Sequence, residues 1–361
     1  MAPPNAPTVY DVAERAGVSI ATVSRVLRTP EAVKQSTRER VLAVVQELGY
    51  VPSASARGLA GRRTGALGLF IPGHEAIDDP VEAHATGTGV RIIDDRTGSA
   101  SRHRGFRADY FDELLRGAEL EAWRSGHALM IGAGRGDGSI DDLAGRVDGL
   151  AIVASTVSDE AVERLAARLP VVLLAGGRNE LPVDHLAVDN RAGMRAVAEH
   201  ALRVRGPGAV LVLAGPIDSP DAEERRQGVR DALAAHGARL DAQHDDGLFT
   251  RDRGRERTAE ALAGGPLGAV IAANDQLALG ALDALLDAGA AVPEQCVVTG
   301  FDGIEEARLA RPPLTTVAQP MEALGRTAIR TLLARIAEPQ RARSDERMPV
   351  TVVLRESCPP A

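Results

Sequence analysis

The sequence of 361 residues predicts an α/β protein in two parts, an all-α head at the N-terminus and a core of doubly wound parallel sheets. Three observations support this prediction. The first sixty residues contain three short helical segments with cap signals and no strand pattern. From Ala66 onward, continuous apolar runs alternate with helical runs, as in parallel sheets covered on both faces. A hydrophobic content of 44% is enough for full cores.

Two helices open the head. The first is predicted over Val9–Ala16, where Thr8 and Asp11 have the spacing of a capping box and Gly17 ends the helix. The second, Ile20–Arg28, follows after only three residues. Two helices joined by a short turn with glycine form the helix-turn-helix pattern, whose second helix enters the major groove of DNA.

A third helix is predicted from Ser36, with Glu39 closing a capping box, to Gly49. Ile20 shares a helical stripe with two of the expected core residues, so periodicity alone favours a buried Ile20. The small core shared by the three helices is expected to contain Val12, Ala13, Val23, Val26, Leu27, Leu42 and Val45.

The second helix carries side chains suited to DNA. Arg25 has the reach to bond guanine O6 and N7, and Thr22 and Ser24 can bond phosphates. An exposed basic face is also ordinary in any three-helix bundle, so for Arg25 alone the two interpretations are about equal.

Charge is divided unevenly along the chain. Residues 1–64 hold nine basic and five acidic side chains, which gives a net charge of +4. The whole chain carries −8, so residues 65–361 carry −12. The average alone argues against nucleic acid as a partner, because phosphates are bound by clustered positive charge. The divided charge instead predicts a head that attracts DNA and a body that repels it.

Several function classes are excluded by what the sequence lacks. Cys296 and Cys358 give neither a disulfide framework nor metal-ligand spacing, which suits a reducing cytoplasm. We expect no signal peptide, no membrane span, no metal and no cofactor, and no catalytic motif of a serine hydrolase, zinc protease or P-loop enzyme is present. The protein is therefore not expected to be an enzyme.

The elements of the core follow from the alternating pattern. The predicted strands are Leu67–Ile71, Ala128–Ile131, Leu150–Val153, Val171–Leu174, Val210–Ala214, Val270–Ala272 and Val297–Thr299. The predicted helices are Phe111–Arg124, Glu160–Arg168, Ala192–Leu202, Ala222–Ala235, Asp252–Leu262, Gln276–Ala288 and Glu322–Ile336. Parallel sheets of this kind bind ligands at the carboxyl ends of their strands.

Specific motifs in both parts resemble those of one family. The runs Tyr10–Leu27, Thr37–Val41, Leu48–Pro52 and Ala56–Gly61 resemble the DNA-binding head of the lactose/galactose repressor (LacI/GalR) family. Ala273–Gly280, Val298–Asp302 and Pro313–Gln319 resemble the sugar-binding core of the same repressors, which is similar to periplasmic binding proteins.

The resemblance implies a domain organisation. It gives a helix-turn-helix head at 1–52, a hinge helix and linker at 53–65, and a two-lobed effector-binding core at 66–361. One lobe would contain about 66–188 and 321–338. The other would contain about 189–319 and 347–357, with a C-terminal strand at Val350–Leu354. The segment at about 74–107 replaces a short loop of the family, and a mobile flap or disordered segment is favoured there over a ligand lid or partner site.

The resemblance also implies roles for single residues. Ile20, Ala21 and Arg25 would read bases, whereas Tyr10, Thr22 and Ser24 would hold the DNA backbone. In the hinge helix, Leu59 would be a wedge in the minor groove that kinks the duplex. The expected DNA-binding residues are together Tyr10, Ser19, Ile20, Ala21, Thr22, Ser24, Arg25, Ala56 and Leu59.

An effector site between the lobes is implied in the same way. The expected residues are Tyr110, Phe111, Ser155, Asp189, Arg225, Phe249, Asn274, Asp302 and Gln319. Carboxylate, amide and guanidinium groups can bond paired hydroxyls, and an aromatic face can pack on a sugar ring. Each residue also has an ordinary structural alternative to effector binding. Asn274 could serve simply as a helix cap, Asp302 could lie in a turn, and Arg225 could lie on a solvated helix face.

One family position is lost in the first lobe. A polar residue, often Asp, usually follows the strand Val171–Leu174 in the family, whereas this chain has Ala175-Gly-Gly-Arg178. Arg178 could supply the missing polarity or select an anionic ligand.

The predicted function is therefore a repressor that binds a palindromic operator as a homodimer under the control of a sugar-like effector. Whether the effector induces or corepresses is open. Two other classes of protein fit the sequence less well: a solute-binding receptor would require a signal peptide, and a sugar kinase with a DNA-binding head would require a phosphate-binding motif.

Overall fold

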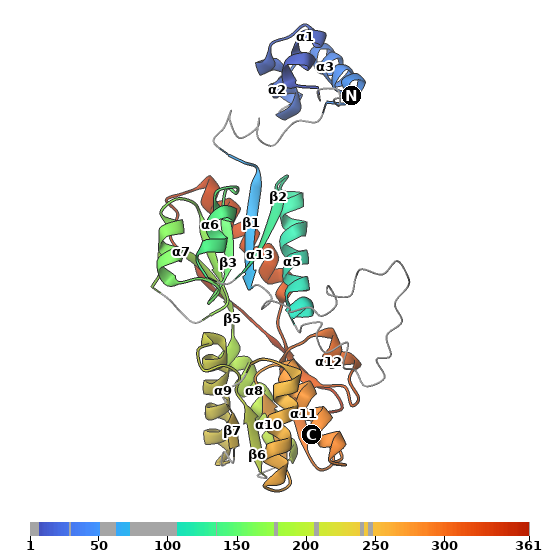
Figure 1. The fold of residues 1–361 in the computed structure, drawn as a ribbon, viewed down its shortest axis with the longest axis vertical. Helices are drawn as coiled ribbons and strands as arrows, with labels where there is room; N and C mark the ends of the chain where they lie inside the picture. The colour runs from blue at the N-terminus through green and yellow to red at the C-terminus, as the bar shows by residue number, and fades with distance from the viewer. Residues whose placement is uncertain are drawn as a thin grey trace, which may run out of the picture. The chain divides into compact units, whose positions relative to one another are not determined.

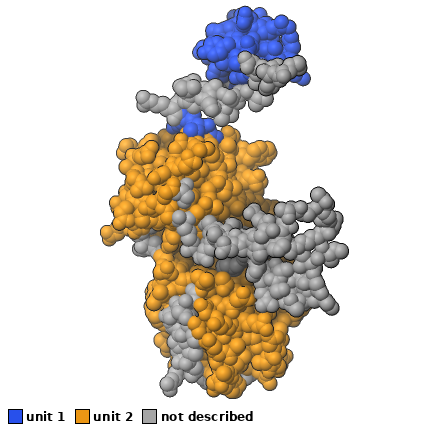
Figure 2. Space-filling model, in the orientation of Figure 1, with its two compact units in different colours: residues 1–65 blue, residues 66–361 orange. Residues whose placement is uncertain are grey.

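The computed structural model describes residues 7–28, 30–50, 63–72, 107–134, 136–176, 180–205, 209–238, 242–244 and 248–360. The chain forms two compact units, residues 1–65 and 66–361 (Figure 2). Ala56 and Leu59 of the predicted hinge helix, and residues 74–106 of the predicted insertion, lie outside the described residues. In the described ranges, no helix is both long and apolar enough to span a membrane.

The head is a small bundle with the predicted helix-turn-helix. Its elements are α1 (Val9–Ala16), α2 (Ile20–Arg28), a 3-10 turn (Pro30–Ala32) and α3 (Gln35–Leu48). The capping box of α1 is confirmed, because the Thr8 hydroxyl accepts from the Asp11 amide at 3.4 Å and the Asp11 carboxylate accepts from the Thr8 amide at 2.6 Å. Gly17 ends α1 with a φ of 63°.

The third helix differs from its prediction in start and orientation. α3 begins at Gln35, and the predicted capping box of Ser36 is wrong, because the Glu39 carboxylate accepts from the Gln35 side-chain amide at 2.9 Å. Leu42, predicted in the core, is 44% exposed, and the neighbouring Val41 and Val44 are buried in its place.

The second unit contains two sheets of six strands each. In the first, the order is β11-β5-β4-β3-β1-β2 and all strands are parallel; in the second, β12-β10-β9-β8-β6-β7, only β12 is antiparallel. The strands are β1 (Ala66–Pro72), β2 (Ala128–Gly134), β3 (Leu150–Val153), β4 (Val171–Leu174), β5 (Asp184–Val188), β6 (Val210–Leu213), β7 (Ala242–His244), β8 (Ala269–Ala272), β9 (Val297–Asp302), β10 (Thr315–Ala318), β11 (Asp345–Met348) and β12 (Thr351–Val353).

Helices cover both faces of each sheet (Figure 1). They are α5 (Arg107–Arg124), α6 (Gly138–Ala144), α7 (Asp159–Ala166), α8 (Asn190–Arg205), α9 (Pro220–His236), α10 (Arg251–Ala263), α11 (Asp275–Asp287), α12 (Glu305–Leu309) and α13 (Met321–Ala337). Successive residues of β1 show the two faces: Leu69 packs with Ile329 of α13, and Phe70 packs with Ile140 of α6. The second sheet lies between α8 and α9 on one face and α10 and α11 on the other.

The chain crosses between the lobes after β5, after β10 and between β11 and β12. The predicted boundary at 347 is wrong, because Arg347 and Met348 belong to β11, which pairs with β5 in the first lobe. β5, β7, β10 and β11, with the short helices α6 and α12, were not among the predicted elements.

Glycines let the covering helices approach each other closely. In the pair α5 and α13, a Cβ on Gly117 would lie 2.0 Å from the Glu322 carbonyl oxygen, and one on Gly325 would lie 2.1 Å from the Leu114 carbonyl oxygen. The pair α10 and α11 has the same arrangement at Gly254 and Gly280. At these crossings backbone packs on backbone, so no larger residue fits without displacing a helix.

Asp275, the first residue of α11, ties three elements of the second lobe together. Its carboxylate accepts hydrogen bonds from the Gly303 and Ile304 amides at 2.8 and 2.9 Å and from the Thr316 hydroxyl at 2.5 Å. Burial raises the pKa of Asp275 to about 8, and the charge of Asp302 adds to the rise. The carboxyl is therefore protonated in the folded protein at pH values where the unfolded chain has lost that proton.

We expect the free energy of unfolding to fall as the pH rises from about 4 to about 8, because a raised pKa in the folded state gives stability that is lost through that range. Asp275→Asn keeps the shape and an acceptor for the two amides but does not titrate. Denaturant titrations at several pH values should show a flatter profile for Asp275→Asn between pH 6 and 8. An unchanged slope would mean that another group is responsible.

Candidate functional site

The residues predicted to contact DNA lie on the surface of the head. Tyr10, Ser19, Ile20, Ala21 and Arg25 are exposed, and Thr22 and Ser24 are half-buried. Ser19 caps α2, because its hydroxyl accepts from the Thr22 amide at 3.2 Å. Burial of Ile20, favoured by periodicity, is wrong: this side chain is 39% exposed at the first turn of α2. An apolar side chain at that position can contact a thymine methyl group.

In the second lobe, Arg225 of α9 lies at the centre of a buried polar network. Its side chain is only 5% exposed, and its Nη1 donates to the Ala273 carbonyl at 2.7 Å and to the Asp302 carboxylate at 3.3 Å. The guanidinium carbon also lies 3.9 Å from the centre of the Phe301 ring. The ordinary alternative for Arg225, a solvated helix face, is wrong.

Asp302 and Gln319 close the other end of this network. The Gln319 side-chain amide donates to the Asp302 carboxylate at 2.7 Å, and the Gln319 backbone amide donates to the Asp302 carbonyl at 3.1 Å. Asp302 has a φ of 118°, a conformation that costs a residue with a side chain about 1–3 kcal/mol. Burial raises the pKa of Asp302 to about 6, although the positive charge of Arg225 opposes the rise.

Two residues that the sequence analysis did not identify extend the network. Arg225 Nε donates to Asn190 Oδ1 at 2.8 Å, and Asn190 Nδ2 donates to Asp221 Oδ1 at 2.9 Å. Burial is the main cause that raises the pKa of Asp221. Asn190 follows the predicted Asp189 directly, and Asp221 is the second residue of α9, after Pro220, so both fit ordinary helix starts and gave no separate signal.

The remaining predicted residues of the second lobe have mainly structural contacts. Asn274 caps α11, since its Oδ1 accepts from the Leu277 amide at 2.9 Å, and capping is the ordinary structural role that the sequence also allows for it. Its Nδ2 donates to the Phe249 carbonyl at 3.5 Å. The Phe249 ring lies where a Cβ on Gly215 would be, 2.3 Å from the nearest ring carbon.

The predicted residues of the first lobe are less well gathered. Phe111 is buried in the core between α5, α13 and the sheet, and the side chain of Tyr110 lies outside the described residues. Ser155 is exposed after β3 with a φ of 63°. Asp189 accepts from the Ala192 amide at 3.1 Å at the start of α8. The structure therefore joins Arg225, Asp302 and Gln319 in one network, but among the described side chains it does not bring Phe111, Ser155 or Asp189 into that network.

Helix α9 also contacts the first lobe at two points. The Gly176 amide, after β4, donates to Asp221 Oδ1 at 3.0 Å. Arg347 of β11 forms two hydrogen bonds with Glu224, at 2.6 and 2.9 Å. Arg225 lies next to Glu224 in α9, so the residue at the centre of the polar network is on a helix held to both lobes.

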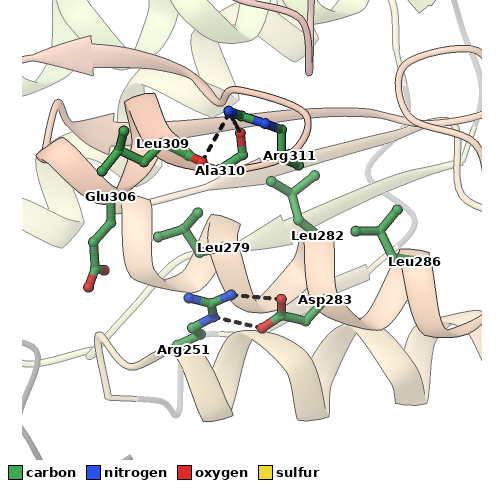
Figure 3. A pocket seen from close by; sticks show the side chains of 9 residues that line it. All are labelled: Arg251, Leu279, Leu282, Asp283, Leu286, Glu306, Leu309, Ala310 and Arg311. Atoms are coloured by element: carbon green, nitrogen blue, oxygen red, sulfur yellow. Dashed lines mark hydrogen bonds and ion pairs between the residues drawn. The ribbon is translucent and has the colours of Figure 1, made fainter. Parts of the chain in front are cut away.

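A groove of about 300 Å³ lies between α10, α11 and α12 (Figure 3). Leu279, Leu282 and Leu286 line it along α11, and Leu309 and Ala310 line the opposite side. Leu286 and Leu309 are 49% and 55% exposed. The ion pair of Arg251 and Asp283, at 2.6 and 2.8 Å, borders the apolar part.

Comparison with protein families gives two matches in this chain. Residues 8–53 match the model for bacterial regulatory proteins of the lacI family, and residues 200–358 match the periplasmic binding protein-like domain. The first match covers the helix-turn-helix, and the second covers most of the second lobe and the returning segments.

Known relatives match over nearly the whole length. The chain is 31% identical over 341 residues to the HTH-type transcriptional regulator CelR of Thermobifida fusca, covering 91% of this chain and 92% of the relative. The Lac repressor dimer bound to operator and the anti-inducer ONPF has a TM-score of 0.79 at 27% identity, covering 98% and 99%. The CelR–cellobiose complex has a TM-score of 0.65 at 29% identity, covering 97% and 99%. The chain belongs to the LacI family of bacterial regulatory proteins.

Proposed function

We propose that this protein is a repressor that binds a palindromic operator as a homodimer and is controlled by a small sugar-like effector bound between its two lobes. The observation that carries this proposal is the pairing, in one chain, of an exposed Ile20 and Arg25 on α2 with the buried network around Arg225. Full-length similarity to an operator-bound dimer and to a sugar complex supports it.

The proposed DNA contacts follow from α2. Ile20 and Ala21 contact bases through apolar surface, Arg25 bonds a guanine, and Tyr10, Ser19, Thr22 and Ser24 hold the phosphates. Ala56 and Leu59 are proposed as the hinge contacts in the minor groove.

We expect Arg25→Ala to weaken binding to a palindromic duplex, selected from random DNA with the purified protein, by about 1–3 kcal/mol, because a bidentate guanine contact is lost. Fluorescence anisotropy would measure this loss and that for an unrelated duplex. Arg15→Ala removes the same charge from the head, but Arg15 pairs with Glu47 at 2.5 Å, so its effect should be smaller. Equal losses on both duplexes would refute base reading by Arg25.

The proposed effector contacts are those of Arg225, Asp302 and Gln319, with Asn274 and Phe249 beside them and Tyr110, Phe111, Ser155 and Asp189 contributed from the first lobe and the crossover. The polar groups of Arg225, Asp302 and Gln319 bond one another. A sugar must replace such contacts with its own hydroxyls, which requires directional donors and acceptors.

We expect at least one member of a panel of neutral mono- and disaccharides to raise the melting temperature of the protein by mass action. Arg225→Lys should lose most of this shift, because an ammonium group cannot donate to Asn190, Ala273 and Asp302 in the fixed directions of a guanidinium. Operator binding without sugar should persist. Arg191→Lys, at a surface pair with Asp231, is the matched control. A normal response from Arg225→Lys would contradict the site.

We propose that the groove bounded by Leu286 and Leu309 contacts the second copy in the homodimer. Leu286 and Leu309 are exposed apolar side chains, and the charges of Arg251 and Asp283 beside them neutralise each other. Such a surface can be buried against the same surface of a second copy of the chain. Leu286→Glu should shift the sedimentation coefficient towards that of a monomer, because a carboxylate would be buried in the interface. Ile217→Glu, at an exposed apolar residue outside this groove, should remain dimeric. A dimeric Leu286→Glu protein would place the interface elsewhere.

A further inference from the structure

An ion pair joins the two lobes beside the strands that cross between them. Arg347 belongs to β11, which pairs with β5 in the first sheet, whereas Glu224 belongs to α9, which packs on the second sheet. Arg347 Nη1 and Nη2 donate to the two Glu224 carboxylate oxygens at 2.9 and 2.6 Å. Two parallel bonds fix direction as well as distance, so this pair restrains the orientation of α9 on the first lobe.

The crossing point lies next to this pair. The chain passes into the second lobe after β5 and again after β11, and there the Asp189 amide donates to the Met348 carbonyl at 3.0 Å. Arg347 directly precedes Met348. Glu224 moves with the second lobe and Arg347 with the first. A rotation of the lobes about the crossing strands therefore changes the geometry of the pair.

The surroundings of the pair allow it to open and close. The Arg347 and Glu224 side chains are 26% and 21% exposed, whereas those of Arg225 and Asp302 are 5% and 6% exposed. A hollow of about 390 Å³ lies beside the pair, lined by Asp189, Arg191, Glu223, Glu224, Gln227 and Arg347. This polar hollow is large enough for water to solvate both charges once they separate. The pair can therefore break without leaving an unpaired charge in the core, which would be costly.

We propose that the ion pair of Arg347 and Glu224 is a reversible latch that sets the resting arrangement of the lobes and thereby the concentration at which the effector acts. Neither residue is among the proposed contacts to effector or DNA. Glu224 precedes Arg225 in α9, so a movement of this helix also moves the centre of the polar network. The link to the effector rests on the proposed function, whereas the latch itself can be measured without ligand or DNA.

Charge substitutions separate a latch from an ordinary surface pair. Glu224→Gln and Arg347→Gln each remove one charge of the pair. The double reversal of Glu224→Arg with Arg347→Glu exchanges the two charges and keeps a pair in the same place. Glu223→Gln is the matched control: this neighbouring carboxylate lines the same hollow, but it bonds Arg226 and Arg230 within α9.

The experiment measures the lobe arrangement as the distance distribution between two spin labels, by double electron–electron resonance on the full-length protein. Glu160→Cys on α7 and Ala235→Cys on α9 place one label on each lobe at exposed positions. The native Cys296 and Cys358 are buried, so we expect them not to react. Dilution with unlabelled protein limits the signal to pairs of labels within one chain, and circular dichroism tests whether each variant is folded.

Without ligand or DNA, Glu224→Gln and Arg347→Gln should shift the distance distribution in the same direction, because both break the same contact and change the population of lobe arrangements. The double reversal should restore the wild-type distribution, and Glu223→Gln should leave it unchanged. A thermal-shift titration follows, with whichever of glucose, ribose and cellobiose most raises the melting temperature. The half-saturating concentration should change about five- to tenfold in both single variants and stay within about twofold in Glu223→Gln.

Separate outcomes would overturn the latch and its link to the effector. Unchanged distance distributions in both single variants would overturn the latch and leave the proposed function intact. A folded double reversal that resembles the single variants would also overturn it, because the effect would then follow from net charge or local structure. A shifted distribution with an unchanged half-saturating concentration would overturn the link to the effector.

Two further results keep the inference distinct from the proposed function. A wild type that responds to no sugar and binds no selected duplex overturns the proposed function, and the distance distributions still decide the latch. If Arg347→Gln is unfolded, Arg347→Lys keeps the charge but not the two parallel bonds. It should give a smaller shift in the same direction as Glu224→Gln, and an unchanged distribution would overturn the latch.

Discussion

A buried guanidinium at the lobe junction is the constraint on which the rest of the second unit depends. Burying an unpaired charge is costly, and removing one partner of a buried pair typically costs about 3–5 kcal/mol. Arg225 is therefore surrounded by acceptors that come from separate elements: Asn190 at the start of α8, Ala273 after β8 and Asp302 at the end of β9. Each acceptor lies at the carboxyl end of a strand or the start of the next helix, where a parallel sheet brings loops together. These elements must lie where their acceptors can reach Arg225, and the bonds to Arg225 in turn hold the elements in those positions.

The same constraint explains why α9 is joined to the first lobe. Its first two turns carry Asp221 and Glu224, which bond Gly176 and Arg347 of that lobe and both come just before Arg225 in the helix. Any shift of α9 relative to the first lobe must change these contacts together. A ligand that bonds this network better in one arrangement of the lobes will shift the population towards that arrangement.

The sequence predicted the layers well because their signal is repeated. Seven apolar strands and seven amphipathic helices were placed from periodicity, and the capping box of Thr8 and Asp11 from spacing alone. The failures have a common cause in tertiary contacts. β11, with the sequence Asp-Glu-Arg-Met, has no apolar signal because it is an edge strand tied by polar contacts, such as the bond of Asp345 to His185. Ile20 and Leu42 have large apolar side chains of the kind usually found in a core, yet both are exposed. Asp221 resembled a helix-start residue, and only the fold brings Gly176, 45 positions away, to it.

Control of DNA binding requires that ligand binding to the second unit changes the free energy of DNA binding by the head. The charge distribution limits how large the non-specific part of that DNA binding can be. The head carries +4 and the rest of the chain −12, so long-range attraction to phosphates is confined to a small basic unit and opposed by the remainder. In the proposed homodimer, affinity then depends on correct docking of two heads rather than on general attraction. In such a system a modest coupling free energy, typically 1–3 kcal/mol, is enough to change occupancy of the operator, and by linkage the operator changes effector affinity by the same factor. A few hydrogen bonds at α9, each worth about 0.5–1.5 kcal/mol, are of the size that this coupling needs.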